Sequence, residues 1–364
     1  MSERAVALCY GTRPQIIKAS RIRRALEGLA PVLAIDTGQH YDYELNELLY
    51  RQLEVADPDL CLEVGSGSHA EQTAAILARA AAIFEERRPR AVVVIGDTNS
   101  TLGAALAAAK LRIPVVHVEA GLRAADGGMA EEINRRAVDA VAALLCTPSA
   151  SATARLQRER PDAVIVETGD VARDVLMRHA GSLPDVRGLL PAGGRYAFAT
   201  LHRAELTDAP WLLARALEAL AALPLPVVLA LHPRTRAALA AHRLTLPAGP
   251  TFSAIPAVGY LESLALAAGA QAVITDSGGL QREAYWLGTP CITLRTETEW
   301  SETVAAGANR LVPPDAPERL GMALSAALAA PCGWGRDAYG DGSAAGRIAA
   351  AVAELAGTSV TVGT

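Results

Sequence analysis

Three acidic side chains follow apolar runs in the first half of the chain, where strands of a sheet would end. Asp97 follows the run at residues 91–95, Glu119 follows the run at 115–118, and Glu131 comes a few residues later. Acids whose pKa values are pushed apart can remove a proton from carbon and return one. The alternatives are a helix N-cap for Asp97 and a helix first-turn charge for Glu131. The three acids together favour acid–base catalysis.

Two basic residues follow the first apolar run, at residues 5–10. Arg13 precedes Pro14, which can open a helix, and Lys18 comes about one turn later. Two cations near a helix N-terminus form a plausible phosphate or carboxylate site, the alternative being a solvent-exposed basic turn. The run is not followed by the Gly-x-Gly-x-x-Gly pattern of dinucleotide-binding folds.

The second half offers a second anion site. Ser277, Gly278 and Gly279 follow the run at 272–275 and open a helical pattern, so their backbone N–H groups would face an anion. Glu283, one turn further on, could accept hydrogen bonds from two ribose hydroxyls. The alternative is a capped helix with a surface charge.

Histidines follow two other runs of the second half. His202 follows the run at 196–200 and is a candidate acid, base or diphosphate contact, or a structural histidine. His232 and Arg234 follow the run at 227–231 in the same way, with a weaker pattern.

Short apolar runs alternate with longer Ala- and Leu-rich segments of helical period. This alternation predicts an α/β fold with parallel sheets and right-handed crossovers. Strands are expected at 5–10, 32–36, 91–95, 115–119, 144–147, 164–167, 196–200, 227–231, 272–275 and 291–294. Helices are expected at 69–87, 99–111, 171–179, 210–223, 261–268, 280–287 and 343–356.

A chain of 364 residues suits two domains. Residues 181–194 are rich in Pro and Gly and predict a linker. We therefore expect an α/β domain at 1–180, a second at 195–342, and a C-terminal helix and tail at 343–364. In such domains ligands gather at the carboxyl ends of the strands.

Composition excludes several classes of function. The net charge is −5 without a basic block, which disfavours nucleic-acid and membrane-surface binding. Apolar stretches are too short to span a membrane. The five cysteines are widely spaced and indicate neither a zinc site nor disulfides, and we expect a cytoplasmic protein. Cys9, Cys146 and Cys291 lie in expected strands, where a buried thiol is typical.

Taken in order, these motifs resemble the UDP-N-acetylglucosamine 2-epimerase family. The resemblance runs from about residue 5 to about residue 312. Its elements lie at 11–18, 37–40, 96–101, 117–123, 131–136, 168–170, 202–203 and 275–283. It implies two Rossmann-like doubly wound domains in a GT-B arrangement, with the site in the interdomain cleft.

The resemblance also implies a reaction and its partners. The family inverts C2 of a UDP-linked 2-acetamido sugar without a cofactor. An acid–base pair removes the C2 proton while UDP leaves anti from C1, and UDP then adds back to the resulting glycal. A homodimer is expected on the same basis. The alternatives are a hydrolysing epimerase, which would release UDP and a free sugar, and a GT-B glycosyltransferase.

Roles follow from the motif positions. The resemblance makes Asp97, Glu119, Glu131 and His202 the catalytic set. The expected substrate-binding residues are Arg13, Lys18, Gln39, Arg123, Arg135, His232, Arg234, Ser277, Gly278, Gly279, Glu283 and Arg295. No metal site is expected.

The chain departs from the common family pattern at Gln15, Ala130, Leu206 and Trp300, where Glu, Pro, Asn and Arg are frequent. Together with residues 41–43 and 231–235, Gln15 and Trp300 look more like the branch that acts on UDP-2,3-diacetamido-2,3-dideoxyglucuronate. Arg123, Arg234 and Arg295 are then possible partners for a uronate carboxylate.

Overall fold

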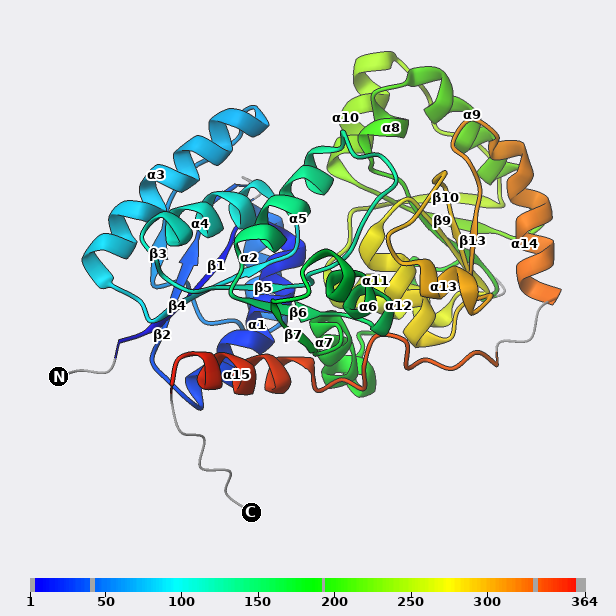
Figure 1. Ribbon diagram of the computed structural model, residues 1–364. Coiled ribbons are helices and arrows are strands. Elements are labelled where there is room, and N and C mark those ends of the chain that lie inside the picture. Colours follow the sequence, from blue (N-terminus) through cyan, green and yellow to red (C-terminus); the bar gives the residue numbers. More distant parts are fainter. Residues whose placement is uncertain (1–3, 40–42, 192–193, 330–332, 358–364) are drawn as a thin grey trace. The chain divides into compact units, whose positions relative to one another are not determined.

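The computed structural model describes residues 4–39, 43–191, 194–329 and 333–357. The chain divides into two compact units, which we call the first unit (Met1–Arg178 with Tyr339–Thr364) and the second unit (His179–Ala338). Each is built on one parallel β-sheet whose strands alternate with helices (Figure 1). The expected class, α/β with two Rossmann-like domains, is confirmed.

The first unit has a seven-stranded sheet in the order β3-β2-β1-β4-β5-β6-β7. Its strands are β1 (Val6–Tyr10), β2 (Val32–Asp36), β3 (Leu60–Cys61), β4 (Ala91–Ile95), β5 (Val115–Val118), β6 (Leu144–Thr147) and β7 (Val164–Glu167). Its helices are α1 (Arg13–Glu27), α2 (Tyr43–Gln52), α3 (His69–Arg87), α4 (Asn99–Lys110), α5 (Ala130–Val141), α6 (Ala150–Glu159), α7 (Val171–His179) and α15 (Ala344–Leu355). The central strands β1 and β4 are wholly buried, as expected for a parallel sheet covered on both faces.

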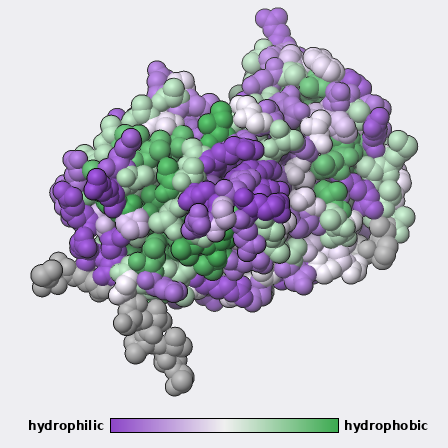
Figure 2. All heavy atoms as spheres, viewed as in Figure 1, coloured by the Kyte–Doolittle hydropathy of each residue, from purple (hydrophilic) through white to green (hydrophobic). Residues whose placement is uncertain are grey.

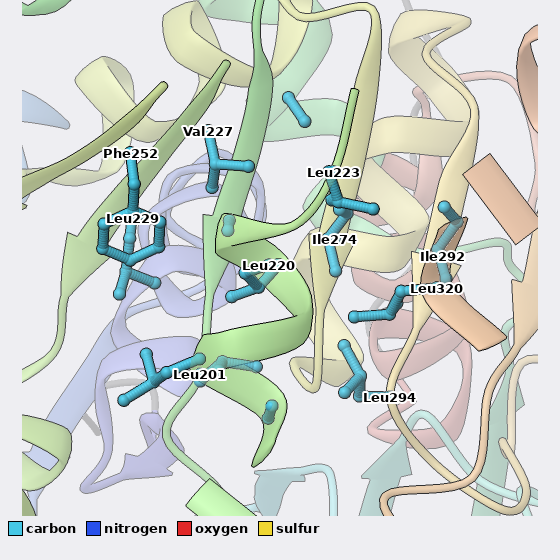
Figure 3. Close-up of a cluster of buried hydrophobic side chains, with 14 of the residues drawn as sticks. Leu201, Leu220, Leu223, Val227, Leu229, Phe252, Ile274, Ile292, Leu294 and Leu320 are labelled. Atoms are coloured by element: carbon cyan, nitrogen blue, oxygen red, sulfur yellow. The ribbon is translucent and has the colours of Figure 1, made fainter. Parts of the chain in front are cut away.

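The second unit has a six-stranded sheet in the order β10-β9-β8-β11-β12-β13. Its strands are β8 (Ala197–Thr200), β9 (Val227–Leu231), β10 (Phe252–Pro256), β11 (Ala272–Thr275), β12 (Cys291–Thr293) and β13 (Asn309–Leu311). Its helices are α8 (Ala204–Thr207), α9 (Pro210–Ala221), α10 (Pro233–His242), α11 (Tyr260–Gly269), α12 (Gly278–Leu287), α13 (Ser301–Ala305) and α14 (Leu320–Ala329). Short 3₁₀ segments are η1 (Ala180–Ser182), η2 (Arg187–Leu189) and η3 (Pro317–Arg319). Figure 3 shows branched apolar side chains such as Leu220, Leu229, Ile274 and Ile292 filling the core on one side of this sheet.

Both sheets have one switch point, where the strand order reverses: between β1 and β4 in the first unit, and between β8 and β11 in the second. Chain connections leave such a point in opposite directions, so a crevice opens beyond the carboxyl ends of the two strands. Half of the expected site residues follow the strands at these two points. They are Arg13, Lys18, Asp97, His202, Ser277, Gly278, Gly279 and Glu283.

The last helix belongs to the first unit. α15 packs against α1, and Figure 1 shows the two helices side by side. The Asp174 carboxylate on α7 accepts hydrogen bonds from the N–H groups of Ala344 (3.0 Å) and Ala345 (2.7 Å). These are first-turn donors of α15, which have no partner within their own helix. Asp174 therefore caps α15 from another part of the chain.

The segment at residues 181–194, expected as a linker, falls within the second unit. It carries η2, and Val186, Leu189 and Leu190 pack against one side of that unit's core. The units thus divide after Arg178 and after Ala338, rather than at the bounds 180, 195 and 342 expected from composition.

The surface and the cysteines complete the description. Figure 2 shows hydrophilic and apolar residues interspersed over one face, consistent with a mean hydropathy of +0.20. No helix in the described ranges is long and apolar enough to cross a membrane. Cys9, Cys146 and Cys291 are free and buried, as expected. Cys332 and the expected tail at 358–364 lie outside the described residues.

Candidate active site

Gln15 ties the turn after β1 to the turn after β4. Its Oε1 accepts hydrogen bonds from the N–H groups of Gly11 (2.9 Å) and Thr12 (3.2 Å) at the start of α1. Its Nε2 donates to the Ile95 carbonyl (2.6 Å) and to Thr98 Oγ1 (2.9 Å). An amide can donate and accept at once, so this one side chain joins both sides of the first switch point.

Glu119 and Lys18 form a buried ion pair between the end of β5 and α1. Their side chains are 6% and 7% exposed, and Lys18 Nζ donates to Glu119 Oε2. Glu119 has φ of +69°, a left-handed conformation that costs a non-glycine residue about 1 kcal/mol or more. Its carboxylate reaches the end of β4, because a Cβ added at Gly96 would lie 3.2 Å from Glu119 Oε2. Arg13, half-buried, begins α1 one turn before Lys18.

Asp97 follows Gly96 and is held by α5. Its carboxylate accepts hydrogen bonds from Arg135 Nε (3.0 Å) and Nη2 (2.5 Å), and its carbonyl accepts one from Asn134 Nδ2 (2.8 Å). The side chain of Asp97 stays 29% exposed, whereas that of Arg135 is 6% exposed. The Arg135 guanidinium is therefore buried on one side of the Asp97 carboxylate, and the other side of the carboxylate stays accessible to solvent. Asp97 directly follows Gly96, and Glu119 Oε2 lies beside the same glycine.

The two neighbouring acids at the start of α5 differ in environment. Glu132 is fully buried and accepts hydrogen bonds from Ala124 N–H (2.9 Å) and from two arginines, Arg135 and Arg136. These contacts hold the loop before α5 against the helix. Glu131 is half-buried in the same first turn. It lies four residues before Arg135, so it shares the helix face that holds Asp97.

Gln39 and Arg123, both expected to bind substrate, are engaged within the first unit. Gln39 Oε1 accepts hydrogen bonds from Ser100 N–H (3.0 Å) and Oγ (2.6 Å). Arg123 donates to Asp139 (2.7 Å) and Glu159 (2.5 Å). The neighbouring motif residues 40–42 lie outside the described residues.

Asp139 joins a buried network that the motif search did not assign to the site. It accepts hydrogen bonds from His117 Nδ1 (2.6 Å), Arg123 Nη1 (2.7 Å) and Gly121 N–H (3.2 Å). Burial by itself would raise the pKa of Asp139, but the charges and hydrogen bonds of His117 and Arg123 outweigh it. The pKa of Asp139 is therefore held below its ordinary value.

At the switch point of the second unit, Asp276 organises the chain after β8. Its buried carboxylate accepts hydrogen bonds from the N–H groups of His202 and Arg203, both at 2.7 Å. The His202 ring lies with Nδ1 3.3 Å from Asp276 Oδ1 and stacks on His232 at 4.8 Å between ring centroids. The side chain of His202 is 31% exposed. Asp276, which sits between expected site residues, thus holds the backbone that carries an accessible imidazole.

The loop at the start of α12 leaves backbone donors for an anion. Ser277 Oγ caps the helix by accepting a hydrogen bond from Leu280 N–H (3.3 Å). The N–H groups of Gly278 and Gly279 belong to the first turn and have no acceptor in their own helix. A Cβ on Gly278 would lie 3.1 Å from a Glu299 carboxylate oxygen, so glycine permits this close approach. Glu283 is buried one turn further along α12.

The remaining expected residues of the second unit take part in local pairs. His232 Nδ1 accepts a hydrogen bond from Arg234 N–H (3.2 Å) and caps α10. Arg234 pairs with Asp208 (3.0 Å), and Arg295 pairs with Glu299 (2.9 Å) in a nearly buried contact. Together with Arg123, each arginine considered for a uronate carboxylate already faces a protein carboxylate.

The structure thus defines a two-domain α/β enzyme architecture. One Rossmann-like unit carries ion-paired acids at its switch point, and the other carries a helix N-terminus and a histidine at its own. Within the described ranges, no cluster of three His, Cys, Asp or Glu side chains is placed to hold a metal ion.

Comparison with known proteins identifies the family. The family model for UDP-N-acetylglucosamine 2-epimerase matches residues 27–353. The chain belongs to this family. It is 40% identical to UDP-2,3-diacetamido-2,3-dideoxy-D-glucuronate 2-epimerase of Pseudomonas aeruginosa, over 95% of this chain and 98% of that protein. It is 37% identical to UDP-N-acetylglucosamine 2-epimerase of Methanocaldococcus jannaschii, over 94% of this chain and 97% of that protein.

A solved structure agrees with this assignment. The crystal structure of the Methanocaldococcus jannaschii enzyme in complex with UDP-GlcNAc and UDP matches with a TM-score of 0.89 at 36% identity. The match covers 96% of this chain and 99% of that one.

The Lys18–Glu119 pair gives a first prediction. Lys18→Met leaves a buried carboxylate without its cation, which should lower the free energy of unfolding by roughly 3–5 kcal/mol. Adding Glu119→Gln should recover most of that stability, because the uncompensated charge is gone. Urea unfolding of both variants measures this. If the single and double variants lost the same free energy of unfolding, the unpaired Glu119 carboxylate would not be the cause of the destabilisation.

The low pKa of Asp139 gives a second prediction, on pH. An acid whose pKa is lower in the folded than in the unfolded protein stabilises the fold at pH values above its unfolded pKa, about 3.9 for Asp. This stabilisation is lost as the pH falls toward the folded pKa. Asp139→Asn should therefore be less stable than the wild type at pH 7, and the difference should shrink below about pH 4. Denaturant unfolding across pH 3–7 measures it, and a constant difference would contradict the assignment.

Proposed function

We propose that this protein inverts C2 of a UDP-linked 2-acetamido sugar by eliminating UDP and adding it back. The base takes the C2 proton, and the electrons of the C2–H bond form the C1–C2 double bond. The C1–O bond breaks at the same time, and its electron pair leaves with UDP. This gives UDP and a 2-acetamidoglycal. A second acid then protonates C2 from the opposite face as the UDP oxygen re-forms the bond to C1. No atom is gained or lost overall, which matches an isomerase without a cofactor.

The placement of Asp97 and Glu119 just after the paired strands β4 and β5 is the observation that carries this proposal. A reaction that removes a proton from one face of a carbon and returns it to the other needs two acids on different sides of the substrate. Asp97 and Glu119 come from neighbouring strands and have different environments: Glu119 is enclosed with Lys18, and Asp97 is partly exposed in front of Arg135. Unequal environments separate pKa values, as an acid and a base require. Glu131 is the third candidate.

The second unit is suited to the departing UDP. In the proposal, the N–H groups of Gly278 and Gly279 and the imidazole of His202 stabilise the negative charge that develops on the diphosphate. Glu283 accepts hydrogen bonds from the ribose hydroxyls. The homodimer expected from the family resemblance stays a prediction.

Solvent-deuterium exchange tests the reaction directly. With UDP-N-acetylglucosamine and with its 2,3-diacetamido uronate analogue as probes, we expect deuterium at C2 of the recovered UDP-sugar, detected by NMR. The probe that exchanges faster identifies the preferred sugar. Release of free sugar and UDP would indicate the hydrolysing route instead. If neither probe exchanged its C2 proton, the proposal would be rejected.

Variants of the two units should separate their roles. Glu119→Gln removes the carboxylate and should abolish C2 exchange while UDP still binds. His202→Ala should abolish turnover and also weaken UDP binding, because the diphosphate loses its imidazole. Isothermal titration with UDP, together with circular dichroism to verify folding, distinguishes the two. Turnover near the wild-type rate in either variant would refute its assignment.

A further inference from the structure

His117 lies in the middle of the first unit's sheet, and both its ring nitrogens have partners. It belongs to β5 and is fully buried. Nδ1 lies 2.6 Å from Asp139 Oδ1, and Nε2 lies 2.8 Å from the Gly96 carbonyl oxygen. The ring of His117 therefore bridges the Asp139 carboxylate and the Gly96 carbonyl.

Both contacts lead to the turns that carry the proposed catalytic acids. Gly96 immediately precedes Asp97, so the Nε2 contact fixes the peptide from which Asp97 extends. The other oxygen of Asp139 accepts a hydrogen bond from Gly121 N–H (3.2 Å), two residues after Glu119. Through Asp139, His117 thus reaches the far side of the Glu119 turn. Gly96 N–H also bonds to the Val118 carbonyl (2.9 Å), just before Glu119.

The conformation of these turns requires such support. Glu119 has φ of +69°, and Gly96 and Gly121 have φ of +68° and +83°. Backbone in this region persists in a non-glycine residue only where surrounding contacts determine it. The helix that carries Asp139 also carries Asn134 and Arg135, which hold Asp97. One helix and one histidine therefore contact both turns.

We propose that His117 and Asp139 form a positioning pair that sets the placement of Asp97 relative to Glu119. Neither residue touches the substrate in this assignment; they act through the backbone of the two turns. The inference rests on the proposed function, because it supposes that both acids act at one carbon. A buried ion pair is often no more stabilising than apolar side chains of similar volume, so its effect should appear in geometry and rate.

Two substitutions separate the two contacts of the ring. An Asn side chain places its amide near the position of Nδ1, so His117→Asn keeps the Asp139 contact and loses the Gly96 contact. A Gln amide reaches the position of Nε2, so His117→Gln does the reverse. We expect kcat to fall about 100-fold in each, as for a displacement of about 1 Å at reacting groups, with KM changed less than about threefold. The substrate is whichever of the two UDP-sugar probes the wild type exchanges at C2.

Glu159→Gln is the matched control. Glu159 pairs with the outer side of Arg123 and is 38% exposed, so its change perturbs the network at its edge without touching His117 or either turn. It should leave kcat within about threefold of the wild type, because exposed ion pairs contribute little. Isothermal titration with UDP should give wild-type affinity in all variants, because the residues proposed to bind UDP belong to the second unit.

The outcomes separate this inference from the proposed function. Absence of C2 exchange in the wild type would reject the proposed function itself. Wild-type exchange with kcat near normal in a folded His117→Asn or His117→Gln variant would overturn the positioning role. A rise in KM at unchanged kcat, or a matching loss of UDP affinity, would also overturn it. If both variants fail to fold, Asp139→Asn provides the same test, with the same expected fall in kcat and the same contradicting result.

Discussion

A carboxylate removed from water loses several kcal/mol of hydration unless cations and hydrogen bonds replace it. This constraint governs the first unit, where one buried acid follows β5 and two others lie on α5. Glu119 meets it with Lys18, Glu132 with two arginines, and Asp139 with His117 and Arg123. Most of these partners come from α1, β5 and α5.

The buried acid of the second unit is compensated differently, and the difference matches the role proposed for that unit. Asp276 takes two backbone N–H groups from the turn after β8 instead of a guanidinium. The proposal assigns the N–H groups at the start of α12 to the diphosphate, together with the imidazole of His202, whose backbone N–H donates to Asp276. In the first unit, where the proposal places proton transfer, the carboxylates are already paired with cations. In the second unit, where the proposal places the diphosphate, backbone N–H groups serve as the donors. Positive partial charge at a helix N-terminus suits a diphosphate, whereas an ion-paired acid suits proton transfer.

The sequence predicted the strands that end at the two switch points, because apolar runs flanked by Gly, Asp and Ser leave few alternatives. It could not predict the partners. Lys18 and Glu119 are 101 positions apart, so their pairing has no local signature. Glu131 and Glu132 share one helix turn, and only tertiary contacts reveal that Glu132 is the structural one. Three strands were missed. β3 has only two residues, β10 ends in Pro and is only partly buried, and β13 has three residues, two of them polar. The return of α15 to the first unit depends on a cap supplied by Asp174, far away in sequence.

Two of the departures from the family pattern have structural counterparts that preserve the site. Gln15 donates to the Ile95 carbonyl as well as accepting at the start of α1, which an ionised Glu could not do. Trp300 lies under Arg282, with the guanidinium carbon 3.7 Å from a ring centroid, and Arg282 Nε donates to the Gly278 carbonyl. An Arg at position 300 would bring a second cation against Arg282, whereas an aromatic face attracts it. The tryptophan therefore belongs with Arg282, and the pair holds the loop at the start of α12 through the Gly278 carbonyl, on the side away from the N–H groups that the proposal assigns to the diphosphate.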